Sequence, residues 1–185
     1  MLVLGSLPGP ESLRKKQYYA NPNNQFWSIM FELFNEELKG DICDKLKRNM
    51  NEGLNGDTCE EQKGGAYEKR KGNINEGLKG GAYEEKVCFL LDHKVAVWDI
   101  IYSANRVGAL DADIENEKPN DIPGLLLAYP RIKRILLAGR KAEKSFHKHF
   151  PNIKVDTVYV PSTSPAYAKK SLTAKIKDWR RAITD

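Results

Sequence analysis

The sequence has few cysteines and no long apolar run. Its three cysteines, Cys43, Cys59 and Cys88, are widely spaced and belong to no CxxC or CxH pattern. Isolated cysteines in odd number argue against a disulfide framework, a structural zinc and an iron–sulfur cluster, and they favour a reducing, cytoplasmic location. No apolar run approaches the roughly 20 residues that cross a bilayer, so we expect neither a membrane span nor a signal peptide.

Histidine patterns typical of metal sites and the phosphate-binding loop of nucleotide-dependent enzymes are also missing. His147 and His149 are two residues apart in an expected helix and so point in different directions, which leaves no metal triad with His93. The GSLPG turn that begins at Gly5 is not followed by GK[ST] and is therefore not a Walker loop. We expect neither a metal ion nor a cofactor.

Charge is distributed unevenly along the 185 residues. Residues 131–185 hold 14 Lys and Arg against 4 Asp and Glu, whereas residues 1–130 hold 16 against 21. The net charge of +5 therefore combines an acidic body with a strongly basic last third. This distribution predicts a polyanionic partner; a basic helix that only faces solvent is the alternative.

Short apolar strands alternate with helical patterns. Near-continuous apolar runs, typical of strands buried on both faces, predict strands at residues 1–5, 94–101, 131–139 and 155–160. Apolar residues at helical spacing predict helices at residues 24–39, 83–92, 122–128, 140–150 and 169–183. This order predicts one α/β domain over residues 1–185, with three layers and a central, mostly parallel four-stranded sheet flanked by helices.

This architecture also predicts where a ligand would bind. Sites in such sheets lie beyond the carboxyl ends of the strands. The segments that follow the first, second and fourth expected strands are GSLPGPES, YSANRVGALD and PSTSPAYA, and all three are rich in polar or turn-forming residues. We expect them to meet in one cleft.

Residues 40–82 do not fit this plan. NEGLNG at Asn51 returns as NEGLKG at Asn75, and KGGAYE at Lys63 returns at Lys79. The copies are rich in glycine and charge, and they are too short and irregular for a solenoid. We interpret them as a repetitive surface insertion in the connection to the second strand, with a functional loop as the alternative.

The segment LVLGSLPGPESLRKKQYYANPNNQFW near the start of the chain is the most specific signal. Gly5, Pro8 and Gly9 predict a tight turn that leaves the first strand and lets the backbone approach a ligand closely. Further on, Asn24 stands two residues before Phe26 at the start of an expected helix. Without further information, Asn24 is explained as a helix cap and Phe26 as a core aromatic residue.

This segment resembles the first motif of the uracil-DNA glycosylase superfamily, in which a GxxPG turn is followed by a stretch ending in NxFW. GSLPG and the doubled tyrosines are similar to the hypoxanthine-DNA glycosylase branch, called family 6. LLDHKVAVWDIIYSANRVGALDADI resembles its middle motif, NDIPGLL the helix that follows, and VPSTSPAYA the closing motif that contacts DNA. Four motifs in the same order extend the resemblance over the chain except residues 39–86. Relatives usually carry a segment ahead of the first strand, which here starts at residue 1, so we expect a missing element or a misassigned start.

The resemblance implies a DNA-repair enzyme that flips a deaminated base out of the helix and hydrolyses its glycosidic bond, hypoxanthine first and uracil second. It implies duplex DNA with a damaged base as the partner, with single strands as a further candidate, and no metal or cofactor. We expect a monomer.

The resemblance also implies roles for residues of the first motif. Asn24 would be the catalytic amide, which cannot deprotonate water but can orient it by donating and accepting hydrogen bonds. Phe26 would be the ring on which the extruded base stacks, and Trp27 a core side chain. The base pocket would be further lined by Ser6, Pro8 and Gly9.

Asp99 stands where uracil-specific members of the superfamily carry a base-reading Asn. An ionised Asp only accepts hydrogen bonds, so it would accept from N1–H of hypoxanthine and oppose the bare N1 of adenine. Guanine shares N1–H and would have to be excluded by other contacts. The alternative is an Asp that caps the strand end or pairs with Arg106.

The closing motif departs from the larger superfamily members. It has Ser162 where they carry a His that stabilises charge on the leaving base, and Ser6 in the first motif has no Asp or Asn beside it. Both departures fit the hypoxanthine branch and weaken the case for strong uracil excision. The hydroxyls implied as phosphate ligands are those of Ser162, Thr163 and Ser164. The wedge that enters the duplex would be Pro165, Ala166 and Tyr167, with Lys169 and Lys170 attracting phosphates from the basic helix that follows. An ordinary Ser/Pro turn is the alternative.

The sequence is also compatible with two functions other than base excision. A non-catalytic nucleic-acid-binding relative would bind DNA in a salt-sensitive manner and excise no base. A small-molecule nucleotide hydrolase of the same fold would act on free inosine and ignore duplex DNA.

Overall fold

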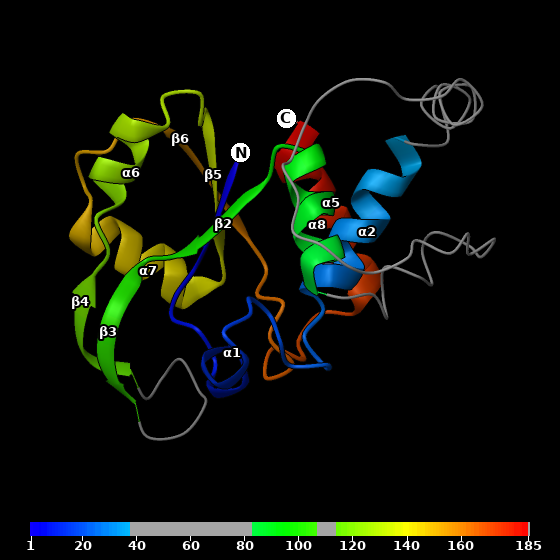
Figure 1. Cartoon of the computed structure of the whole chain (residues 1–185), viewed down its shortest axis with the longest axis horizontal. Coiled ribbons are helices and arrows are strands. Elements are labelled where there is room, and N and C mark those ends of the chain that lie inside the picture. Colours follow the sequence, from blue (N-terminus) through cyan, green and yellow to red (C-terminus); the bar gives the residue numbers. More distant parts are fainter. Residues whose placement is uncertain (38–82, 107–113, 185) are drawn as a thin grey trace, which may run out of the picture.

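A computed structural model describes residues 1–37, 83–106 and 114–184 (Figure 1). The repetitive insertion expected at residues 40–82 lies outside the described residues, as do Cys43 and Cys59. Cys88 is an exposed free thiol. Within the described part of the chain, no helix is long and apolar enough to cross a membrane.

Four parallel strands form the main sheet, in the order β2-β1-β5-β6. They are β1 (Leu2–Gly5), β2 (Ala96–Asp99), β5 (Arg134–Ala138) and β6 (Asp156–Val160). In the central strand β1, Val3 pairs with Val97 of β2 and Leu136 of β5, and it has no exposed surface. The sequence-based expectation of a parallel four-stranded sheet is confirmed.

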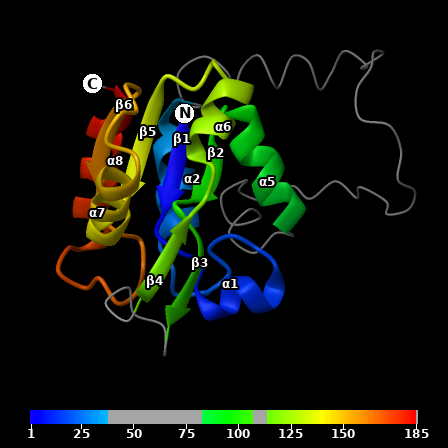
Figure 2. The ribbon, with the colours of Figure 1, turned by 90° about the vertical axis from the view of Figure 1, so that its left-hand side faces the viewer.

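Helices cover both faces of the sheet (Figures 1 and 2). On one face, Val3 and Leu136 pack in an apolar cluster against α2 (Phe26–Glu37), α5 (Tyr83–Asp92) and α8 (Leu172–Thr184). On the other face, Leu2 and Leu137 pack in a second cluster with α6 (Ile122–Ala128) and α7 (Arg140–His149). Successive strand residues point to opposite faces, and both faces are buried, which is why the strands are continuously apolar. The three-layer α/β architecture is confirmed.

A hairpin of two antiparallel strands, β3 (Ile101–Arg106) and β4 (Ile114–Pro119), was not expected from the sequence. The expected strand at residues 94–101 ends early, because Ile100 and Ile101 donate hydrogen bonds to the carbonyls of Gly5 (2.9 Å) and Ser6 (3.0 Å) and the chain then leaves the main sheet. Most hairpin side chains lie outside the core, so no apolar run marked them as strands.

The buried carboxylate of Glu117 on β4 fastens this hairpin to α7. It lies 2.8 Å from Lys148 Nζ and 3.0 Å from Lys141 Nζ, and it accepts a hydrogen bond from Ser145 Oγ at 3.0 Å. Burial alone would raise the pKa of Glu117. Hydrogen bonds from these groups and from His149 outweigh burial and lower the pKa to about 2.

The five expected helices are found; the ends of α7 and α8 differ by one residue from the expectation, residues 38–39 lie outside the described residues, and the larger differences are two helix starts and one additional short helix. Helix α1 (Pro10–Lys15) was not expected. Helix α2 begins at Phe26, two residues later than predicted. Helix α8 begins at Leu172 because Ser171 caps it, its Oγ accepting from Ala174 N–H at 3.2 Å. Lys169 and Lys170 therefore precede the helix on which they were expected.

Candidate functional site

A cleft of about 200 Å³ lies at the carboxyl edge of the main sheet, and all four parallel strands lead into it. Its walls include Gly5 at the end of β1, Asp99 at the end of β2, Ala138 at the end of β5 and Ser162 after β6. Residues of all three segments expected to converge line the cleft, the second through Arg106, while residues 107–111 of that segment lie outside the described residues. The volume is below the roughly 300–1,000 Å³ of pockets for drug-sized ligands, and it suits a single heterocycle.

Asp99 is buried where β1 and β2 end side by side. Its side chain approaches Gly5 so closely that a β-carbon there would lie 2.5 Å from Asp99 Oδ1, and 3.8 Å from the hydroxyl oxygen of Tyr19. Glycine at position 5 is what permits this approach. Asn120 Nδ2 donates to the backbone carbonyl of Asp99 at 2.8 Å, which braces the strand end. On the rim, Arg106 donates to the carbonyl of Pro8 at 2.7 Å.

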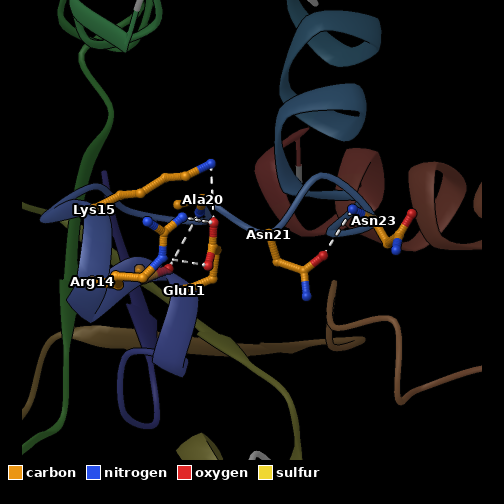
Figure 3. A network of polar contacts seen from close by, with 7 residues as sticks. Glu11, Arg14, Lys15, Ala20, Asn21 and Asn23 are labelled. Carbon is orange, nitrogen blue, oxygen red and sulfur yellow. Dashed lines mark hydrogen bonds and ion pairs between the residues drawn. The ribbon is translucent and has the colours of Figure 1, made fainter.

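The segment of residues 18–24 forms another wall of the cleft, and its backbone N–H groups donate hydrogen bonds that hold it in place. Ala20 N–H donates to Ser12 Oγ at 3.2 Å, and Asn23 N–H donates to Asn21 Oδ1 at 2.9 Å (Figure 3). Tyr18 N–H donates to the hydroxyl of Tyr83 on α5 at 3.0 Å. The segment is therefore fixed to α1 on one side and to α5 on the other.

Helix α1 carries a surface ion cluster beside this segment. Arg14 and Lys15 lie 2.7 Å and 3.0 Å from the carboxylate of Glu11, which also lines the cleft (Figure 3). Hydrogen bonds from Arg14 and then Lys15 lower the pKa of Glu11 to about 2. Glu11 is thus ionised at neutral pH and paired with both cations.

Tyr18 and Tyr19, rather than Phe26, are the aromatic residues that line the cleft. Phe26 has no exposed surface, and Tyr19 stacks on it with ring centroids 3.9 Å apart and an interplanar angle of 14°. Tyr19 lines the cleft, whereas Phe26 does not. The expectation that Phe26 itself faces the cleft is wrong. The reason is the backbone of Tyr19, whose φ of 53° folds the chain back and lays the tyrosine over the phenylalanine.

Asn24 lines the cleft and also stabilises the start of α2. Its Oδ1 accepts a hydrogen bond from Phe26 N–H at 2.9 Å, and its own N–H donates to the carbonyl of Asn21 at 2.9 Å. It also borders a second recess of about 400 Å³ on the side of Trp27 and Lys86. The helix-end role and the position at the cleft therefore coexist. The amide nitrogen and one lone pair of Oδ1 are not needed for the helix contact.

The closing turn, residues 162–167, forms the remaining wall. Ser164 N–H donates to Ser162 Oγ at 3.2 Å, and Ala166 N–H donates to Ser164 Oγ at 3.3 Å. Pro165 and Ala166 are exposed at its tip. Thr163 is only 2 % exposed, which removes its hydroxyl from the surface that a phosphate could reach. Its carbonyl accepts from Gln25 N–H at 3.0 Å and so joins the turn to the start of α2.

Tyr167 and the basic residues around it do not all face solvent. Tyr167 is half-buried, and Lys175 on α8 is 1 % exposed beneath it. Lys170 forms an ion pair with Asp178, and Lys169 is exposed. The basic helix expected to attract phosphates therefore offers fewer free cations near the turn than its sequence indicates.

The tyrosines of the cleft remain protonated over a wide pH range. Burial, and after it the negative charge of Asp99, raises the pKa of both Tyr18 and Tyr19 above the usual value. Their hydroxyls therefore act as donors as well as acceptors. Sequence reasoning missed these two rings, together with Asn21 and Glu11, as lining residues.

Most residues expected at the site share this cleft. The expected residues that line it are Ser6, Pro8, Gly9, Asn24, Asp99, Ser162, Thr163, Ser164, Pro165 and Ala166. Those that do not are Phe26, Tyr167, Lys169 and Lys170. Within the described residues, no three His, Cys, Asp or Glu side chains are gathered to hold a metal ion.

Comparison with solved structures identifies the class to which this fold and cleft belong. The chain superposes with a TM-score of 0.63 on the solution NMR structure of a proposed uracil DNA glycosylase from Methanosarcina acetivorans, at 26% sequence identity, covering 98% of this chain and 89% of the other. The fold is that of the uracil-DNA glycosylase superfamily.

Sequence relatives specify the family within this class. The chain is 30% identical over 166 residues to a hypoxanthine DNA glycosylase of Methanosarcina acetivorans, a match that covers 90% of this chain and 79% of the relative. It is 25% identical over 187 residues to a hypoxanthine DNA glycosylase of Methanosarcina barkeri, covering 99% and 89%. No protein-family model matches. The chain belongs to the hypoxanthine DNA glycosylase family.

Proposed function

We propose that this protein is a monofunctional DNA glycosylase that extrudes a deaminated base, hypoxanthine first and uracil second, and excises it by hydrolysis without a metal or cofactor. The observation that carries the proposal is the small cleft at the sheet edge, where an amide (Asn24), an aromatic ring (Tyr19) and a carboxyl group (Asp99) meet. These are the three groups that base excision with water calls for.

Asn24 is the proposed water-orienting residue. Cleavage of the glycosidic bond passes through a sugar with oxocarbenium character, and the attacking water is a weak nucleophile that must be held in place. Because Oδ1 of Asn24 is fixed by Phe26 N–H at 2.9 Å, the amide plane is set before any substrate enters. The amide nitrogen can then donate to the water, and the second lone pair of Oδ1 can accept from it.

Tyr19 is the proposed stacking platform, and Phe26 supports it from below. The near-parallel pair at 3.9 Å lets a third ring continue the stack on the cleft side of Tyr19. Asp99 would accept the N1–H of hypoxanthine, a hydrogen bond that adenine cannot make. The protonated hydroxyls of Tyr18 and Tyr19 supply donors on the same wall.

DNA is the proposed partner, as a duplex with a damaged base or as a single strand. The exposed tip formed by Pro165 and Ala166 is suited to enter the space that the extruded base leaves, with Ser162 and Ser164 at its base. Lys169, exposed next to this turn, would attract backbone phosphates. Lys170 contributes less because Asp178 pairs with it.

An oligonucleotide duplex with one inosine opposite thymine tests the proposal. We expect an abasic product that alkali cleaves, and much less product from a matched uracil duplex. If the wild-type protein at micromolar concentration binds the duplex but releases no base, the protein is a non-catalytic relative. Release of hypoxanthine from free inosine alone would indicate a small-molecule hydrolase.

Two substitutions separate the catalytic role of Asn24 from its helix contact. Asn24→Ala removes both, and we expect excision to fall by about 100-fold or more and stability by about 1 kcal/mol. Asn24→Ser keeps a side-chain oxygen for Phe26 N–H but has no amide. We expect near-native stability with the same loss of excision. Full activity of Asn24→Ser would remove Asn24 from the mechanism.

A further inference from the structure

Lys175 is a buried lysine that the mechanism above does not use. Lysine is almost never fully buried unless its ammonium group is paired, yet Lys175 is only 1 % exposed. Its Nζ donates to Gln25 Oε1 at 2.8 Å and to the carbonyl of Tyr167 at 2.9 Å. It also lies 5.1 Å from the centre of the Tyr167 ring. All three contacts tie α8 to the closing turn and to the start of α2, the two segments that supply Ser162 and Asn24 to the cleft.

The residues that Lys175 joins are neighbours of functional positions. Gln25 follows Asn24 directly, and Tyr167 follows the exposed tip of the closing turn. Tyr167 also lies near Tyr159, whose ring carries the guanidinium of Arg140 at 4.2 Å. Tyr167 is therefore an anchor at the base of the tip, and Lys175 fixes this anchor to the start of α2.

Asn24 does not depend on this link alone. Gln25 N–H still reaches the carbonyl of Thr163 at 3.0 Å, and Asn24 N–H still reaches the carbonyl of Asn21 at 2.9 Å, when the Lys175 side chain is replaced. Tyr167 N–H donates to the carbonyl of Ser164 at 3.0 Å within the turn, whereas the carbonyl of Tyr167 accepts from Lys175 Nζ, which lies outside the turn on α8. Loss of Lys175 thus removes the hydrogen bond that joins the base of the turn to α8, whereas the backbone contacts of Asn24 and Gln25 remain.

We propose that Lys175 is a positioning residue for base extrusion, which sets the tip of the closing turn at the height needed to enter the duplex while the base is in the cleft. Lys175 reaches neither the base nor the water. The inference rests on the proposed function, because only an enzyme that opens a duplex needs the tip. It predicts that Lys175 matters for double-stranded substrate and little for single strands, where no partner strand has to be displaced.

The test compares excision rates on two substrates that share one inosine-containing strand, used single-stranded and as a duplex. In Lys175→Met, we expect the duplex rate to fall by about 10-fold to 100-fold and the single-strand rate by no more than about threefold. Lys177→Met is the control, because Lys177 is exposed on the same helix and carries the same charge. It should change both rates by the same factor. The rates are measured below saturation on one preparation, so the fraction of folded enzyme cancels from their ratio.

Gln25→Met breaks the same link from the other end while Lys175 stays in place. It should also lower the ratio of the duplex rate to the single-strand rate. If Lys175→Met does not fold, Gln25→Met alone tests the positioning role. Equal losses on both substrates in either variant would overturn the proposal and leave Lys175 a structural residue. If wild type excises hypoxanthine from neither substrate, the proposed function fails instead, and the two failures are thereby distinguished.

Discussion

Gly5→Ala is the substitution whose effect follows most directly from the geometry of the cleft. The new β-carbon would lie 2.5 Å from Asp99 Oδ1, although non-bonded atoms ordinarily approach to about 3.5 Å. The two strands cannot separate, because Gly5 and Asp99 are paired in the parallel register of β1 and β2. The carboxylate, which is 6 % exposed, must therefore move by about 1 Å within a packed environment.

The magnitude is the difference between two opposing effects. Overpacking of this kind costs about 1–3 kcal/mol. Gly5 does not have a positive φ, so alanine fits its backbone and recovers about 0.4–1 kcal/mol by restricting the unfolded chain. We expect a net loss of between roughly 0 and 2.6 kcal/mol in the free energy of unfolding. Displacing Asp99 by about 1 Å should lower hypoxanthine excision by about 100-fold.

Urea unfolding of a double-mutant cycle measures this effect. In the background of Asp99→Ala the clash is absent, so Gly5→Ala should become neutral or slightly stabilising. Gly9→Ala is the matched control, because a β-carbon at Gly9 meets nothing within 4 Å. Its cost should be the same in both backgrounds. If Gly5→Ala destabilises the protein equally with and without the Asp99 carboxylate, the reasoning from close approach is refuted.

Four further substitutions test other parts of the structure. Phe26→Ala should lose about 3–5 kcal/mol in urea unfolding, whereas Tyr19→Ala should lose less stability but most of the excision activity; the reverse order would contradict the assignment of Tyr19 to the cleft. Because the folded-state pKa of Glu117 is lowered from 4.5 to about 2, its stabilising contribution is present above pH 4.5 and is lost as the pH falls to 2. Glu117→Gln should therefore show a flatter loss of stability over that range, and an unchanged slope would count against the network. Gly139 has a φ of 106°, and a β-carbon there would lie 3.1 Å from Ser162 Cβ, so Gly139→Ala should lower the melting temperature and weaken excision together.

The local pattern of apolar residues was sufficient to predict the three layers of this fold. The strands at β1, β5 and β6 and the helices α5 and α6 were predictable because burial on both faces leaves continuous apolar runs, and burial on one face leaves a helical period. The hairpin of β3 and β4 was not predictable, because its side chains are mostly polar. Its two strands are stabilised by pairing with each other and by the contacts of β4 with α7.

For the candidate site, the sequence by itself determined which strand ends meet at the cleft. Residues that follow parallel strands lie at the carboxyl edge of the sheet. The sequence order of strands and turns therefore already groups Gly5, Asp99 and Ser162. The resemblance to the hypoxanthine-DNA glycosylase branch came from four motifs and their order along the chain. The sequence relatives belong to the same family.

Only the tertiary structure decided which side chains point into that cleft. The left-handed backbone conformation of Tyr19 places its ring over Phe26. The spacing of apolar residues in a sequence does not reveal the φ angle of an individual residue. Lys175 resembles any other cation of a basic helix until the closing turn and Gln25 are seen to converge on it. Side-chain burial depends on contacts between residues up to 150 positions apart, and a local pattern carries no information about such contacts.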